Sequence, residues 1–220
     1  MRRLSLILLV ACLVASVPTW AATIRVAETG EDGFSENTDE QTLPSTAQFG
    51  AFYLGTYTVS AVPYNLDGAW IFRSTGIPQG ATVNSCTITL QINTADIQAG
   101  TPEGTWYGFA VDSPTDFNAA DAHRVSDHHT RTTANVPDVI AGGTTTYTSP
   151  SLVSVCQEIV NRAGYTGDLG ITWRNTGVTA DEYWPWLDYT DNSSQAALLT
   201  YTYTAGGGPS MQFLKRRISP

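Results

Sequence analysis

Short alternating segments separated by turn residues run through most of the chain, and they limit the folds that are open to it. Turn sequences such as Glu-Asp-Gly at 31–33 and Ile-Pro-Gln-Gly at 77–80 divide these segments. About nine such strands cannot bury one face each in a single open sheet, so the sequence predicts two packed antiparallel sheets. The predicted strands are 22–28, 51–59, 67–74, 82–93, 104–112, 130–137, 167–174, 182–190 and 196–204.

One segment departs from the strand pattern. Between 150 and 163 the apolar residues recur at helical spacing, with Leu152, Cys156 and Ile159 on one face. Ser149 followed by Pro150 is typical of a helix start, and Gly164 suits a helix end. The prediction is therefore an all-β antiparallel β-sandwich over 22–204 with one α-helix at about 150–163.

The two ends of the chain differ from the body. A basic start and an apolar run at 4–17, too short to span a bilayer, precede small residues suited to cleavage after Ala21. Residues 1–21 are thus predicted to be a signal peptide, which implies a secreted, cell-surface or periplasmic protein. The alternatives are a buried helix or a lipoprotein signal cut before Cys12. The glycine-rich, basic stretch 205–220 is predicted to be a flexible tail, or else a segment that docks on a partner.

The charge of the body restricts its partners. The formal net charge is −9, but residues 1–21 and 205–220 hold five of the eleven basic residues. The body therefore sets six basic residues against twenty acidic ones, a net charge of −14. This charge disfavours nucleic acids and anionic membranes. It is compatible with neutral glycans, cations or basic proteins, and equally with an acidic surface that only keeps the domain soluble.

Two cysteines remain after the predicted cleavage. Cys86 alternates with polar residues in its strand and therefore points to the buried face, as Cys156 does on the helix. Two inward cysteines in an exported protein can form a disulfide, while the alternative is a pair of small unpaired core residues.

Five longer stretches of the sequence match a recurring pattern of other proteins in the same order along the chain. They are AWIFRSTGIPQGATVNSCTITLQI at 69–92, EDGF at 31–34, RTTANV at 131–136, PSLVSVCQEIVNRAGY at 150–165 and AALLTYTYT at 196–204. Together they resemble secreted bacterial and metagenomic β-sandwich modules with an "IPxGAxIxxAxLxL" pattern, and more distantly the DNRLRE-type modules related to carbohydrate-binding domains. The DNRLRE signature is absent. The resemblance implies a jelly-roll β-sandwich with a binding or adhesive role, and it assigns no catalytic residue.

The stretch EYWPWLDYTDN at 182–192 is rich in aromatic residues and acids. If it is extended, Tyr183 and Leu187 lie on the face that better suits the core, and Glu182, Trp184, Trp186 and Asp188 lie on the other. Indoles flanked by carboxylates suit a sugar, because pyranose C–H faces stack on aromatic rings and carboxylates accept hydroxyl hydrogen bonds. Similar alternation adds Trp106 to this predicted ligand-binding set. The alternative is that these tryptophans are core residues.

Metal and catalytic signals are sparse. The best metal hypothesis is a structural calcium in an acidic loop, held by Asp112, Asp116, Asn118 and Asp121, with a second acidic loop at 188–192. His123, His128 and His129 are expected in a solvated loop. No hydrolase, zinc-protease or phosphate-loop motif occurs, so no catalytic residue is assigned and no cofactor beyond calcium is expected.

These features favour a secreted, non-catalytic module that binds a polysaccharide or a cell-surface glycan. Paired carboxylates for glycoside hydrolysis stay open as an alternative, since their separation in space is invisible in the sequence. A second alternative is a structural subunit of an extracellular layer, filament or virion-like appendage, which would make protein contacts through edge strands or the tail.

Overall fold

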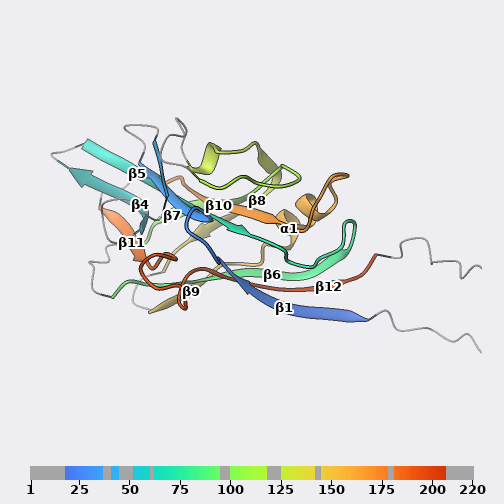
Figure 1. Cartoon of the computed structure of the whole chain (residues 1–220). Helices are drawn as coiled ribbons and strands as arrows, with labels where there is room; N and C mark the ends of the chain where they lie inside the picture. Colours follow the sequence, from blue (N-terminus) through green and yellow to red (C-terminus); the bar gives the residue numbers. More distant parts are fainter. Residues whose placement is uncertain are drawn as a thin grey trace, which may run out of the picture.

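The computed structural model of the chain describes residues 18–36, 41–44, 52–59, 62–94, 100–117, 125–141, 145–177 and 181–206. The predicted signal peptide up to residue 17 and the tail from 207 onward lie outside these residues. Within them the chain forms two packed antiparallel sheets and a single α-helix, so the predicted all-β sandwich is confirmed (Figure 1).

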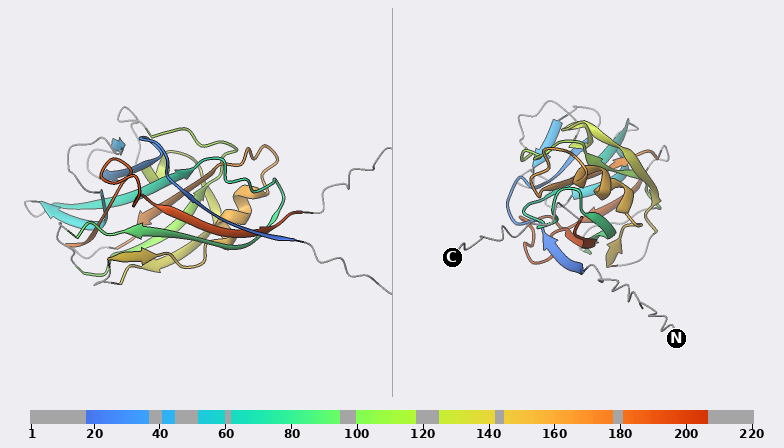
Figure 2. Two further views of the ribbon diagram at one scale, coloured as in Figure 1. Left: turned by 60° about the horizontal axis from the view of Figure 1, so that its bottom comes forward. Right: turned by 90° about the vertical axis from the view of Figure 1, so that its right-hand side faces the viewer.

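The smaller sheet has four strands, in the order β1 (Thr19–Arg25), β12 (Leu198–Thr204), β6 (Thr82–Gln91) and β9 (Thr146–Thr148). Its outer strand β1 begins beside the end of β12, with Thr19 opposite Thr204 (Figure 2). Cleavage after Ala21 would therefore remove the first three residues of β1, whose side chains are all exposed.

The larger sheet has eight strands. Six of them follow one path: β11 (Glu182–Trp186), β4 (Phe52–Val59), β5 (Val62–Phe72), β10 (Leu169–Asn175), β7 (Glu103–Phe109) and β8 (Arg131–Val139). The other two strands are β2 (Asp32–Glu36), which pairs with β5 and β3, and β3 (Gln41–Pro44).

The strand order is that of a jelly roll. The chain visits β1, β5, β6, β7, β8, β9, β10 and β12 while crossing repeatedly between the sheets. Spatially these strands lie as β1-β12-β6-β9 in one sheet and β5-β10-β7-β8 in the other, the arrangement of two interleaved Greek keys. Strands β2, β3, β4 and β11 extend the larger sheet beyond this unit.

The helix α1 (Val153–Val160) is shorter than the predicted 150–163. Ser149 is not its N-cap. The Ser149 hydroxyl instead accepts a hydrogen bond from the Ile88 N–H and donates to the Pro150 carbonyl, and Leu152 precedes the helix without a side-chain cap. The C-cap is Asn161 rather than Gly164. Tertiary contacts at Ser149 therefore replace the local capping that the sequence suggests.

Helix α1 joins the two sheets at one end of the sandwich (Figure 1). Its Cys156 forms a disulfide with Cys86 on β6, with 6.7 Å between the Cα atoms, which confirms the first of the two alternatives. On the other side, the Glu158 carboxylate accepts hydrogen bonds from the Thr133 and Ala134 N–H groups of β8. A disulfide fits an oxidising compartment such as the cell exterior.

Near the end of β5, both faces of the larger sheet are covered. Trp70 and Phe72 point into the main core between the sheets. On the opposite face Ile71 packs in a second cluster with Phe109 and Val125, the latter from the 3-10 helix η1 (Val125–Asp127). Strand β5 is therefore buried on both sides, which a half-buried strand pattern does not anticipate.

Arg73, at the end of β5, holds several loops together. Its guanidinium pairs with Glu31 at 3.4 Å, Asp168 at 3.1 Å and Asp116. It also donates to the Pro114 carbonyl. Arg73 therefore connects the end of β5 to the segments that carry Glu31, Asp116 and Asp168.

Candidate functional site

Strand β11 turns its tryptophans inward. It pairs with β4, so that Trp184 lies opposite Leu54 and Trp186 opposite Phe52. Both indoles are 1% exposed, and the Trp186 ring lies 4.8 Å from Phe52 and 4.9 Å from Trp70 between centroids. The prediction that these indoles face solvent is wrong, because a buried ring offers no face to a sugar.

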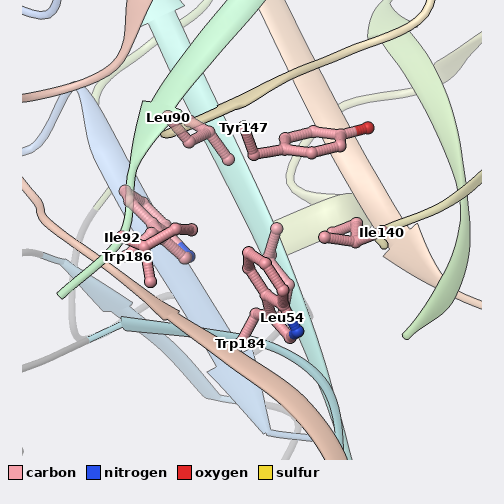
Figure 3. Close-up of a pocket in the computed structure, with 7 residues that line it drawn as sticks. All are labelled: Leu54, Leu90, Ile92, Ile140, Tyr147, Trp184 and Trp186. Atoms are coloured by element: carbon pink, nitrogen blue, oxygen red, sulfur yellow. The ribbon is translucent and has the colours of Figure 1, made fainter. Parts of the chain in front are cut away.

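The surroundings of these indoles are apolar. Around them lies a small pocket that has no room for a water molecule (Figure 3). The lining residues come from β4, β6, β9 and β11, together with the residues that directly follow β6 and β8. The lining residues are Leu54, Leu90, Ile92, Ile140, Tyr147, Trp184 and Trp186.

The other members of the predicted binding set are also displaced. Trp106 is fully buried, with its indole N–H donating to Asp138 at 2.8 Å, so its assignment to a solvent face is wrong. Asp188 is buried as well. Glu182 is half-buried at the start of β11. The predicted residues do not form an exposed surface.

The opposite face of β11 carries a different aromatic group, which we call the tyrosine row. It consists of Tyr183 on β11 with Tyr53 and Tyr57 on β4. The ring of Tyr183 lies 5.7 Å from that of Tyr53 and 5.0 Å from that of Tyr57, both edge-on. Tyr57 is 43% exposed, and the other two rings are half-buried. The strands that carry the row, β4 and β11, lie toward the end of the sandwich away from α1 (Figure 1).

Gly55 makes this arrangement possible. It lies opposite Tyr183 in the strand pair and between the two tyrosines of β4. Its φ is +122°, and a Cβ atom there would come within 2.0 Å of the Glu182 carbonyl oxygen. Only glycine fits, because any side chain would push β11 away from β4. Sequence parity had assigned Tyr183 to the core, so it could not reveal the row.

The described aspartates of the loop proposed for calcium form ion pairs with two different arginines. Asp112 pairs with Arg162 at 2.8 Å, and Asp116 pairs with Arg73. Asn118 and Asp121 lie outside the described residues. Among the residues that are described, no three His, Cys, Asp or Glu side chains are grouped to hold a metal ion. A calcium site centred on Asp112 and Asp116 is thus not supported.

The two described histidines lie together. Their ring centroids are 4.4 Å apart, and each Nε2 lies within hydrogen-bond distance of Thr115. Both rings also contact Phe109 of the second cluster. His128 and His129 are half-buried and contribute to packing, rather than lying free in a solvated loop.

Two buried carboxylates meet where β2 begins and β11 has ended. Asp32 accepts a hydrogen bond from the Tyr189 N–H at 2.8 Å, and Asp188 accepts one from the Asp191 N–H at 2.6 Å. Burial, and next the nearby Asp188 charge, raise the pKa of Asp32 to about 8. Burial, with the Asp191 charge adding to it, raises the pKa of Asp188 to about 6.

This burial predicts a pH dependence of stability. Asp32 has a pKa of 3.8 when unfolded and a higher one when folded, so the native state keeps a proton that the unfolded chain loses. The stabilisation is full below pH 3.8 and is lost as pH rises toward 8. In EDTA, wild-type protein should therefore lose more stability than Asp32→Asn between pH 4.5 and 8, measured by urea unfolding. Asp127→Asn, an exposed carboxylate, serves as control and should follow the wild type; parallel curves for all three proteins would refute the assignment.

The comparisons with known proteins leave the site to be interpreted from its geometry. The chain matches no protein-family model and no curated protein. Among the described residues, no helix is long and apolar enough to cross a membrane.

Proposed function

We propose that this protein is a secreted, non-catalytic module that binds glycans through the tyrosine row. The observation that carries the proposal is the row itself, with Tyr57 43% exposed beside two half-buried rings. Exposed aromatic side chains on a β-sheet give flat apolar surface at a small cost in conformational entropy, and their hydroxyls supply hydrogen bonds. Asp181, whose carboxylate accepts a hydrogen bond from the Thr58 N–H next to Tyr57, supplies an acceptor for sugar hydroxyls.

The pattern of the sequence supports the same role. Its likeness to secreted jelly-roll modules implies a binding or adhesive function, and the disulfide agrees with export. The acidic body favours a neutral polysaccharide over an anionic one. The buried carboxylates do not support glycoside hydrolysis, because Asp32 and Asp188 expose 0% and 3% of their surface and a catalytic pair must reach the glycosidic bond.

Replacing Tyr57 with alanine should weaken glycan binding by at least about fivefold in Kd, since loss of an interface aromatic typically costs about 1 kcal/mol or more. Its stability should change by no more than about 0.5 kcal/mol because the ring is exposed. Affinity electrophoresis in gels containing a neutral β-glucan, xylan or mannan measures the binding, with alginate as the anionic comparison.

Two further variants sharpen this experiment. Tyr57→Phe keeps the ring, so it should retain binding if stacking dominates. Tyr107→Ala removes a half-buried tyrosine on β7, three strands away from β4 in the larger sheet, and should bind like the wild type. If Tyr57→Ala is retarded as strongly as the wild type in every gel that retards the wild type, the tyrosine row is not the binding site. No retardation of the wild type in any gel would count against glycan binding.

Strand β1 favours the structural-subunit alternative. It is an outer strand of the smaller sheet, its first five residues are exposed, and Trp20 is 55% exposed. An exposed outer strand can pair with another chain. Sizing of proteins that begin at Thr19 and at Ala22 tests this, since only the longer one should assemble if β1 supplies the contact.

A further inference from the structure

Asp32 and Asp188 are buried acids whose hydrogen bonds do not satisfy all of their carboxylate oxygens. Asp32 opens β2 opposite Trp70, in the interior of the larger sheet. The loop after β11 covers it, because Tyr189, next to Asp188 in the chain, donates its N–H to one Asp32 oxygen. Two segments that are 157 positions apart in sequence thus bring two acids together.

No basic side chain in the described structure lies in an ion pair with these two acids. Neither Asp32 nor Asp188 takes part in an ion pair among the described residues, whereas the neighbouring Glu31 pairs with Arg73 and accepts the Ala27 and Glu28 N–H groups. The other acid nearby, Asp191, has the same sign as Asp188 and raises its pKa. Ionised carboxylates removed from water are costly unless a positive charge or hydrogen bonds compensate them.

One oxygen of the pair also lacks a partner. Asp32 is 0% exposed, and its Oδ1 is buried without a hydrogen bond while its Oδ2 receives the Tyr189 N–H. A buried carboxylate oxygen without a donor is rare in folded proteins. Such an oxygen, near the charge of a second carboxylate, has the chemistry that a hard divalent cation requires.

We propose that Asp32 and Asp188 form a calcium site that fastens the loop after β11 to the start of β2. The two carboxylates supply the charge, and main-chain carbonyls and water complete the six to eight oxygen ligands that calcium takes. A site with two carboxylates belongs with the weaker extracellular calcium modules, whose Kd is on the order of 0.1–1 mM. Calcium bound here also steadies β11, the strand that carries Tyr183.

The test uses the full folded protein stripped with EDTA and dialysed into chelator-free buffer at pH 7.5. Adding 10 mM CaCl₂ supplies the ion at about 10 to 100 times the expected Kd. In a domain of this size, that should raise the Tm by about 3–8 °C. Titration calorimetry with CaCl₂ should give one site per chain. Asp32→Asn and Asp188→Asn should each lose the Tm shift and bind calcium at least about 10-fold more weakly.

Asp112→Asn is the matched control, since Asp112 belongs to the acidic loop that is paired with Arg162. It should keep the full calcium shift. An unchanged Tm in wild-type protein at 10 mM CaCl₂ would overturn the proposal and leave the pair holding a proton instead. A calcium shift that survives in both Asp32→Asn and Asp188→Asn would overturn it too, because the ion would then bind elsewhere.

Discussion

Replacing Trp186 with alanine is expected to lower the free energy of unfolding by about 3–5 kcal/mol, the usual cost of deleting a large aromatic side chain from a core. Trp186 is 1% exposed and packs edge-on against Phe52 while also contacting Trp70. Its removal therefore leaves a cavity between the two sheets that these neighbours cannot fill without moving. Urea unfolding followed by far-UV circular dichroism measures the loss.

Val139→Ala is the control for this experiment, because Val139 is 54% exposed at the end of β8. Its stability should stay within about 0.5 kcal/mol of the wild type. The two variants separate the two interpretations of the aromatic stretch. A Trp186→Ala protein that is as stable as the wild type but fails to bind glycan would show that this indole lies at the surface.

Replacing both Cys86 and Cys156 with alanine is expected to cost about 4 kcal/mol. The disulfide closes a loop between residues 70 positions apart, and cross-linking that length of chain restricts the unfolded state by about this amount. Alanine is chosen because both cysteines are buried and a small apolar side chain leaves no unpaired polar group. The urea midpoint of the variant should fall well below that of the oxidised wild type.

Reduced wild-type protein provides an independent comparison. With tris(carboxyethyl)phosphine present throughout unfolding, its midpoint should approach that of the double variant. Equal midpoints for the oxidised protein, the reduced protein and the double variant would mean that the bridge contributes nothing to stability. A single Cys86→Ala change is less informative, since it leaves a thiol free to form intermolecular disulfides.

The two proposals concern different ends of β11. The tyrosine row requires Tyr183 to be held over Gly55, and the calcium site fixes the loop that follows Trp186. Glycan binding that strengthens with calcium would link them, whereas binding equal in calcium and EDTA would show that they are independent. Each has its own readout, so the failure of one leaves the other testable.

Local patterns predicted much of the fold. Strand β6 was expected at 82–93 and runs from Thr82 to Gln91, and β12 was expected at 196–204 and begins at Leu198. Alternation over seven or more residues is a strong local signal. Three strands were missed, of which β9 has three residues and β3 has four. So few residues cannot show a period, and these strands exist because neighbouring strands offer backbone partners.

The candidate site was predicted less well, for a physical reason. Both faces of 182–190 carry aromatic residues, so parity identifies two sets of residues without saying which one is buried. The choice of Leu187 and Tyr183 as the core face was wrong. Both indoles are buried instead, Trp186 against Phe52 and Trp70, because large apolar rings gain most from leaving water. That comparison needs the residues opposite, which the segment itself does not contain.

The sequence alone determined the alternation that makes strands, the need for two sheets, and the inward direction of Cys86 and Cys156, because these follow from local geometry and composition. Only the tertiary structure decided that the two sulfurs meet, that Tyr183 faces outward, and that Asp32 lies against the loop of Asp188. Contacts between distant segments depend on how the sheets pack, and burial depends on what covers a side chain. Neither the contacts nor the burial of a side chain can be inferred from the residues next to it in the sequence.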